Sequence, residues 1–125
     1  MTINPKPSNK PEAIDNETLE LLGKEFDLTS DALQLFKEVA QTMLRREKDC
    51  DSVILENGKG GFVAASFLKG KFDHGESIPS TDSEIPNMNR TFNAAVNAGK
   101  NSGIEVMGAE KPLGPRAIVL PMCAP

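Results

Sequence analysis

The sequence contains neither tryptophan nor tyrosine, and phenylalanine, which occurs six times, is its only aromatic residue. Tryptophan and tyrosine are common anchors of high-affinity protein interfaces and of stacking on nucleic-acid bases. Their absence argues against a site that depends on either kind of contact. The core must therefore be built from leucine, isoleucine, valine, methionine and the six phenylalanine rings.

Histidine is almost as scarce, because His74 is the only one in the chain. A catalytic zinc ion usually has two or three His or Cys ligands, so a single histidine does not suffice for such a centre. Asp73 and Glu76 flank His74, which leaves a weak divalent-metal site within residues 73–84 as an alternative. We expect no metal ion and no cofactor.

The two cysteines, Cys50 and Cys123, are too few for the disulfide framework of small secreted domains, although one bridge between them is geometrically possible. The N-terminal residues contain no apolar segment of the kind found in signal peptides. No apolar run approaches the roughly 18 residues that span a bilayer. We therefore expect a cytoplasmic protein in which both cysteines are free thiols.

Positive charge is in deficit, with 14 Lys and Arg against 18 Asp and Glu, a formal net charge of -4 and a pI of about 5.0. Nucleic-acid affinity comes largely from clustered basic side chains that displace counterions. The densest basic run, at residues 45–48, is followed at once by acidic residues and is typical of a solvated helix end. We expect no nucleic-acid and no membrane partner, and instead a protein partner with a basic surface.

Phosphate-binding loops are also missing. Gly58, Gly60 and Gly61 lack the last glycine of a dinucleotide fingerprint, because residue 63 is valine. Neither Gly-Lys pair of the chain is followed by the Ser or Thr of a Walker motif. A hairpin turn beginning at Asn57-Gly58 explains these glycines.

What is present is the pattern of one domain with both helices and strands. The 125 residues suit a single core. Helical spacing and capping residues predict helices beginning near residues 15–17 and 29–31 and a third at 88–101, and apolar runs predict strands at 53–56, 62–68, 104–107 and 116–120. The expected fold class is α+β, a small, mostly antiparallel sheet with helices packed on it and the element order α-α-β-β-α-β-β.

The folded domain is expected at residues 15–121, between a flexible proline-rich tail at 1–14 and a short C-terminal tail at 122–125. Shared periodicity predicts that apolar residues from all these elements form one core. Its predicted members are Leu33, Phe36, Ala40, Met43, Val53, Leu55, Val63, Phe67, Phe92, Val96, Ile104, Val106, Ile118 and Leu120.

Two segments form the candidate binding surface. Residues 69–87 are polar and too long for a simple connector, and their acidic side chains project a negative potential that attracts a basic partner. Residues 108–115 form a second loop, stiffened by prolines. The predicted partner-binding residues are Asp73, His74, Glu76, Asp82, Glu84 and Leu113.

By elimination, the sequence favours a non-enzymatic protein that binds another macromolecule, as an adaptor, an inhibitor or immunity-type partner, or a regulatory subunit. A homodimer is compatible with it. The alternative is a small hydrolase in which His74, oriented by Asp73 or Asp82, activates Cys50 or a serine of the 69–87 segment. Cys50 suits this role poorly, because it follows a helix C-terminus and lies between two acids, where a thiolate is disfavoured.

Overall fold

The computed structural model describes residues 14–110 and 113–120. Its helices are α1 (Asn16–Glu25), α2 (Ser30–Arg46) and α3 (Ile85–Ala98), and a 3-10 turn, η1 (Gly99–Ser102), follows α3. Its strands are β1 (Cys50–Glu56), β2 (Phe62–Leu68), β3 (Lys71–Ile78), β4 (Glu105–Met107) and β5 (Ala117–Leu120). The predicted α+β class is confirmed, and the element order differs from the prediction by the additional strand β3. Apart from residue 14, the predicted tails lie outside the described residues.

The sheet has five strands in the order β3-β2-β1-β5-β4, and every neighbouring pair is antiparallel. β1 is central, with Cys50 opposite Leu68 on β2 and Ser52 opposite Leu120 on β5. Both of the strands expected inside the sheet, β1 and β2, have a neighbour on each side. The two edges are formed by β3 and the short β4.

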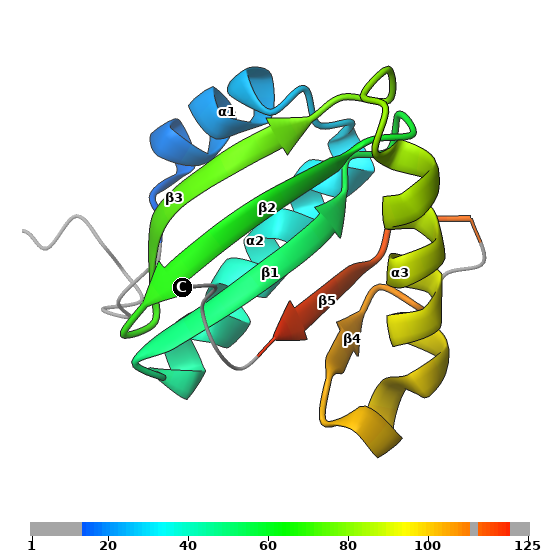
Figure 1. The fold of residues 1–125 in the computed structure, drawn as a ribbon. Coiled ribbons are helices and arrows are strands. Elements are labelled where there is room, and N and C mark those ends of the chain that lie inside the picture. The colour runs from blue at the N-terminus through cyan, green and yellow to red at the C-terminus, as the bar shows by residue number, and fades with distance from the viewer. Residues whose placement is uncertain (1–13, 111–112, 121–125) are drawn as a thin grey trace, which may run out of the picture.

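Side chains alternate between the two faces of the sheet, and α1 and α2 cover one of them (Figure 1). Phe36 of α2 is at the centre of this layer, with ring centroids 6.5 Å from Phe26, 6.3 Å from Phe67 and 5.9 Å from Phe72. The strands add branched residues such as Val53 from β1. We call this side the covered face.

α3 lies on the opposite side, next to β4 and β5 (Figure 1). Phe92 of α3 packs there against Phe62 and Ile118, in a cluster separate from the one around Phe36. The prediction of one core is therefore wrong, because the sheet lies between two clusters. Leu33, Phe36, Ala40, Met43, Val53, Leu55, Val63 and Phe67 belong to the first, Phe92, Val96, Ile104, Val106 and Ile118 belong to the second, and Leu120 belongs to neither.

No described helix lies over β2 and β3 on the side of α3 (Figure 1). Leu68, at the end of β2, is 44% exposed there. The register and the alternation of side chains define the residues of this region, which we call the open face. They are Cys50, Ser52, Ala64, Ser66, Leu68, Lys71, His74 and Glu76.

The prediction of a loop throughout residues 69–87 is wrong for β3. Lys69 and Gly70 have φ angles of +52° and +86°, which permit a two-residue turn between the paired residues Leu68 and Lys71. Gly75 lies within β3, where Phe26, the residue that follows α1, packs against it. A Cβ atom at this position would lie 2.8 Å from the ring of Phe26, which is a usual reason for glycine inside a strand.

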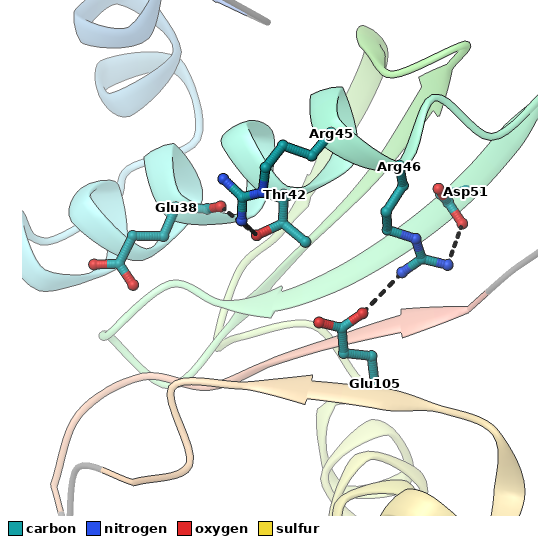
Figure 2. Close-up of polar contacts among 6 residues, drawn as sticks. All are labelled: Glu38, Thr42, Arg45, Arg46, Asp51 and Glu105. Carbon is teal, nitrogen blue, oxygen red and sulfur yellow. Dashed lines mark hydrogen bonds and ion pairs between the residues drawn. The ribbon is translucent and has the colours of Figure 1, made fainter.

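The basic run at the end of α2 is only partly the solvated helix end that was predicted. Arg46 points toward the sheet, with Nη2 3.3 Å from Asp51 Oδ1 and Nη1 2.9 Å from Glu105 Oε1 (Figure 2). The Asp51 side chain is only 2% exposed. Arg45 instead donates a hydrogen bond to Thr42 on its own helix. Arg46 thus links α2 to the central strand and to the edge strand β4.

Candidate functional site

β3 is an edge strand with charged, exposed side chains. Lys71, Asp73, His74 and Glu76 are all exposed. His74 Nδ1 lies 2.6 Å from Asp73 Oδ2, and the two side chains are 72% and 44% exposed. Ser66 pairs with His74 while the next residue of β2 pairs with Phe72, so Asp73 is the extra residue of a β-bulge.

The turn that follows β3 carries the other two predicted acids, and both are exposed. Asp82 Oδ1 accepts a hydrogen bond from the backbone N–H of Glu84 at 2.8 Å, and the backbone N–H of Asp82 donates to the carbonyl of Pro79 at 2.9 Å. These bonds define the local path of the chain just before α3. From Asp73 to the end of the strand at Ile78 is five residues, roughly 17 Å, so the acids are spread along one edge and do not form one cluster.

The β1–β2 hairpin turn lies beside this acidic turn. The buried side chain of Asn57 organises it, because Asn57 Oδ1 accepts hydrogen bonds from the backbone N–H groups of Lys59 at 2.7 Å and Gly61 at 3.0 Å. The predicted hairpin is therefore present. Its conformation depends on the Asn57 amide as well as on glycine φ angles. A Cβ atom on Gly60 would lie 3.3 Å from the Cβ atom of Ser80, which places the two turns in contact.

A cleft of about 350 Å³ lies next to the hairpin turn. It is lined by residues of the α2 N-terminus, the hairpin turn, α3 and the segment 113–115, among them Asp31, Gly60, Asn89 and Leu113. Leu113 is 99% exposed. Parts of the two predicted segments, 69–87 and 108–115, therefore come to the same end of the sheet. Asp73 and His74 lie away from this end, along the β3 edge.

An ion pair next to this cleft was not predicted from the sequence. The Arg116 guanidinium donates hydrogen bonds to Glu56 Oε1 and Oε2, both at 3.0 Å, and to Asn93 Oδ1 at 2.9 Å. It also lies 5.2 Å from the ring centroid of Phe92. The hydrogen bonds to Glu56 raise the pKa of Arg116 above its ordinary value. Glu56 and Arg116 are 60 positions apart, so no local sequence pattern relates them.

Cys50 is disulfide-bonded, so the expectation of a free thiol is wrong for this residue. A disulfide sulfur is not the thiolate nucleophile that the hydrolase hypothesis requires. The other cysteine of the chain, Cys123, lies outside the described residues. The expectation for Cys123 therefore stays a prediction.

The serines of the 69–87 segment are also poorly placed for the hydrolase hypothesis. Ser77 pairs with Val63 of the covered face, and Ser80 is next to Gly60. The serine opposite His74 is Ser66 of β2. Sequence reasoning missed Ser66, because this pairing follows only once residues 71–78 are recognised as a strand.

The alternative of a metal site requires several donor side chains within reach of one ion. Within residues 14–110 and 113–120, no three His, Cys, Asp or Glu side chains come close enough together to hold a metal ion. Asp73 and His74 form a pair, and Asp82 and Glu84 lie beyond the end of β3. The acids of residues 73–84 are thus divided between two places on the edge.

None of the described helices has the length and apolar character needed to cross a membrane. No protein-family model, curated protein or solved structure matches the chain. The fold and the surface define a small three-layer α+β domain with one charged edge and one half-covered sheet face.

Proposed function

We propose that this protein acts by binding another protein, as an adaptor, an inhibitor or immunity-type partner, or a regulatory subunit, and that it is not an enzyme. The observation that carries the proposal is β3, an eight-residue edge strand with exposed charged side chains. It leads directly into an acidic turn. Strand, turn and the neighbouring segment 113–115 make up the proposed binding surface.

An edge strand has one row of backbone N–H and C=O groups that no neighbouring strand pairs. A partner can add a strand of its own to this edge, so that main-chain hydrogen bonds provide affinity and side chains provide specificity. Asp73, Glu76, Asp82 and Glu84 are exposed along it, with Lys71 as the one permanently positive residue of β3. This excess of negative charge favours a partner with a basic surface and speeds their encounter.

The charge and the bulge also have a protective interpretation, since natural proteins use both to prevent unwanted pairing at sheet edges. The two interpretations differ in one respect that experiment can address. A protective edge repels every strand, whereas a binding edge accepts one partner and needs the acidic side chains of β3 and its turn for this binding. We propose that β3 is a binding edge of a cytoplasmic protein whose partner is neither nucleic acid nor membrane. A second copy of the chain is among the partners to be tested.

The test neutralises the four acids together, as Asp73→Asn, Glu76→Gln, Asp82→Asn and Glu84→Gln. The tagged variant and the wild type are used to capture partners from an extract of the native cell. We expect the variant to keep its fold and lose the partner, and wild-type capture to weaken with salt, because exposed charges are screened over about 8 Å at physiological ionic strength.

A matched control removes four exposed acids elsewhere. Glu20, Glu25, Glu38 and Glu47 lie on or next to α1 and α2, and their replacement by Gln changes the net charge by the same amount. Capture should survive in this control. Equal capture by the two quadruple variants would contradict a role for the β3 edge.

A specific observation keeps the hydrolase as a second candidate. The Asp73–His74 pair, 2.6 Å apart, has the composition of the orienting half of a catalytic triad, and Ser66 stands opposite His74. A fluorophosphonate probe, which labels activated serines, tests it directly. We expect no labelling, and labelling that Ser66→Ala and His74→Ala both abolish would replace the binding proposal.

A further inference from the structure

The β3 edge carries its basic and acidic side chains at opposite ends. β3 lies at one side of the sheet (Figure 1), and no strand of the described residues pairs with its outer side. Lys69 and Lys71 are exposed at the start of this edge. Glu76 is exposed near its end, and the exposed acids Asp82 and Glu84 follow in the turn. Two antiparallel copies related by a twofold axis therefore bring the basic start of each edge opposite the acidic end of the other.

The bulge at Asp73 makes a second copy of β3 a better match for this edge than a straight strand. Phe72 packs on the covered face, and a Cβ atom on Gly75 would meet Phe26 on the same face. Two residues, Asp73 and His74, separate them, whereas a straight strand has one residue between neighbours on the same face. A second copy of β3 has the same two residues in the same place. Phe72 of each copy can therefore lie opposite Gly75 of the other with no residue left over on either strand.

This match determines the register of the pairing. When Phe72 lies opposite Gly75 of the other copy, the next pair along the strands is Lys71 and Glu76. Both side chains belong to the open face, and opposite residues are about 4.5–5.5 Å apart between Cα atoms. The contact therefore contains two pairs of opposite charge, which stabilise a strand pair. A register in which Glu76 lies opposite its own copy places like charges together and is disfavoured.

The centre of the contact is apolar on the covered face and polar on the other. Phe72 is half-buried at the edge. Opposite Gly75, which has no side chain, its ring covers the backbone of the other copy and lies next to Phe26 there. On the open face, His74 lies opposite its own copy at the twofold axis. The Asp73 carboxylate, 2.6 Å from His74 Nδ1, balances positive charge on each ring.

We propose that β3 pairs antiparallel with β3 of a second copy of the chain, with Lys71 of each copy opposite Glu76 of the other, and that the symmetric dimer joins the two five-stranded sheets into one. This pairing rests on the proposed function, since it names a partner for the same edge. A second copy and the strand of another protein then compete for the same backbone groups. The contact is confined to one edge strand of each copy, and interfaces below roughly 1,200 Å² are weak, so we expect a reversible dimer.

The first experiment measures the mass of the purified full chain by sedimentation equilibrium, from about 10 μM to about 1 mM protein. A gel without reductant checks that no disulfide links two chains. We expect a monomer–dimer equilibrium for the wild type. Lys71→Glu and Glu76→Lys should each weaken it about tenfold or more, because each variant places two pairs of like charges in its own dimer.

An equimolar mixture of these two variants is the decisive sample. In the mixed dimer, Glu at position 71 of one chain lies opposite Glu76's replacement, Lys, in the other, and Glu76 of the first chain lies opposite Lys71 of the second. Both pairs of opposite charge are thus restored. We expect the mixture to associate more strongly than either variant alone, and close to the wild type. Equal association of the mixture and the single variants would overturn the register.

Matched controls reverse two exposed charges on α2. Lys37→Glu and Glu38→Lys change the net charge by the same amounts and should dimerise as the wild type does. Circular dichroism checks that all four variants keep their fold, as expected for exposed positions. The same weakening in the controls would assign the effect to net charge and overturn the proposed pairing.

Carbodiimide cross-linking tests the contact directly, because it joins a Lys amine to a neighbouring carboxylate without a spacer. Chains of natural isotope content and ¹⁵N-labelled chains are mixed, cross-linked and analysed by mass spectrometry after digestion. We expect a peptide pair that links Lys71 to Glu76 and contains one chain of each isotope. Cross-linked dimers that lack this pair would contradict the proposed contact.

Failure of the dimer and failure of the proposed function give different results. A wild type that stays monomeric up to about 1 mM, or that dimerises equally well with either charge reversal, would overturn the dimer. The capture experiment with the quadruple acid variant would still decide whether β3 binds another protein. A dimer with the predicted cross-link, together with equal capture by the two quadruple variants, would confirm the pairing and reject the foreign partner.

Discussion

The two faces of the sheet are covered in different ways. On one side, α1 and α2 pack against the sheet and Phe36 contacts three other phenylalanine rings. On the other side, α3 covers only the region around Phe62 and Ile118, and the open face carries serine, alanine and charged residues. Most of the buried apolar side chains therefore lie on the covered face, which should contribute most of the stability.

The largest expected effect compares one ring from each cluster. Phe36 is 1% exposed and Phe92 is 3% exposed. Phe36→Ala should lower the free energy of unfolding by about 3–5 kcal/mol, and Phe92→Ala should cost no more than about 3 kcal/mol. The cavity at Phe92 opens next to a shallow hollow of about 150 Å³ on the sheet surface, where the surroundings can adjust more easily. Urea denaturation of both variants measures the difference. Equal losses would mean that the half-covered face contributes as much as the covered one.

The second comparison concerns two neighbouring arginines on α2. Arg46→Met removes the guanidinium that pairs with the buried Asp51 carboxylate, and an unpaired buried polar group costs about 1–3 kcal/mol. Arg45→Met removes only an exposed contact with Thr42 and should change the stability by less than about 0.5 kcal/mol. Adding Asp51→Asn to Arg46→Met should recover part of the loss. A double variant no more stable than Arg46→Met alone would show that the charge of Asp51 is not the cause.

These contacts show where the sequence was sufficient and where it was not. Helical spacing identified α2, because a one-sided apolar stripe depends only on local sequence. Periodicity cannot say which face of the sheet a strand residue joins, so Phe36 and Phe92 were assigned to the same core. β3 was missed because Gly75, a usual sign of a loop, is required in this strand by the ring of Phe26.

The candidate site was predictable only in its composition. The acids and Leu113 could be identified as exposed, polar or loop residues from the sequence. Their distances from one another could not, since these depend on which strands pair. The Glu56–Arg116 ion pair and the Ser66–His74 cross-strand pair both join residues distant in sequence, and neither leaves a local pattern.

The third prediction tests the ion pair beside the cleft. Arg116→Lys keeps the positive charge but loses the planar fork that contacts both oxygens of Glu56. Because the pair is partly exposed, the loss should be at most about 1 kcal/mol. It should also become smaller at high salt, as screening weakens the wild-type pair. Denaturation of wild type and variant at low and high salt gives both quantities. A loss that does not depend on salt would point to the contact with Phe92 instead of the contact with Glu56.

The smallest expected effect is that of Leu68→Ala, which is compared with the adjacent residue Phe67 of β2. The two side chains point to opposite faces of the sheet. Phe67 is fully buried on the covered face and Leu68 is 44% exposed on the open face. Leu68→Ala should cost less than about 1 kcal/mol, since only part of its transfer free energy is involved and no closed cavity forms, whereas Phe67→Ala should cost about 3–5 kcal/mol. Both are measured under reducing conditions, so that no disulfide contributes to the reference state. A cost for Leu68→Ala close to that of Phe67→Ala would mean that something in the reduced protein covers the open face.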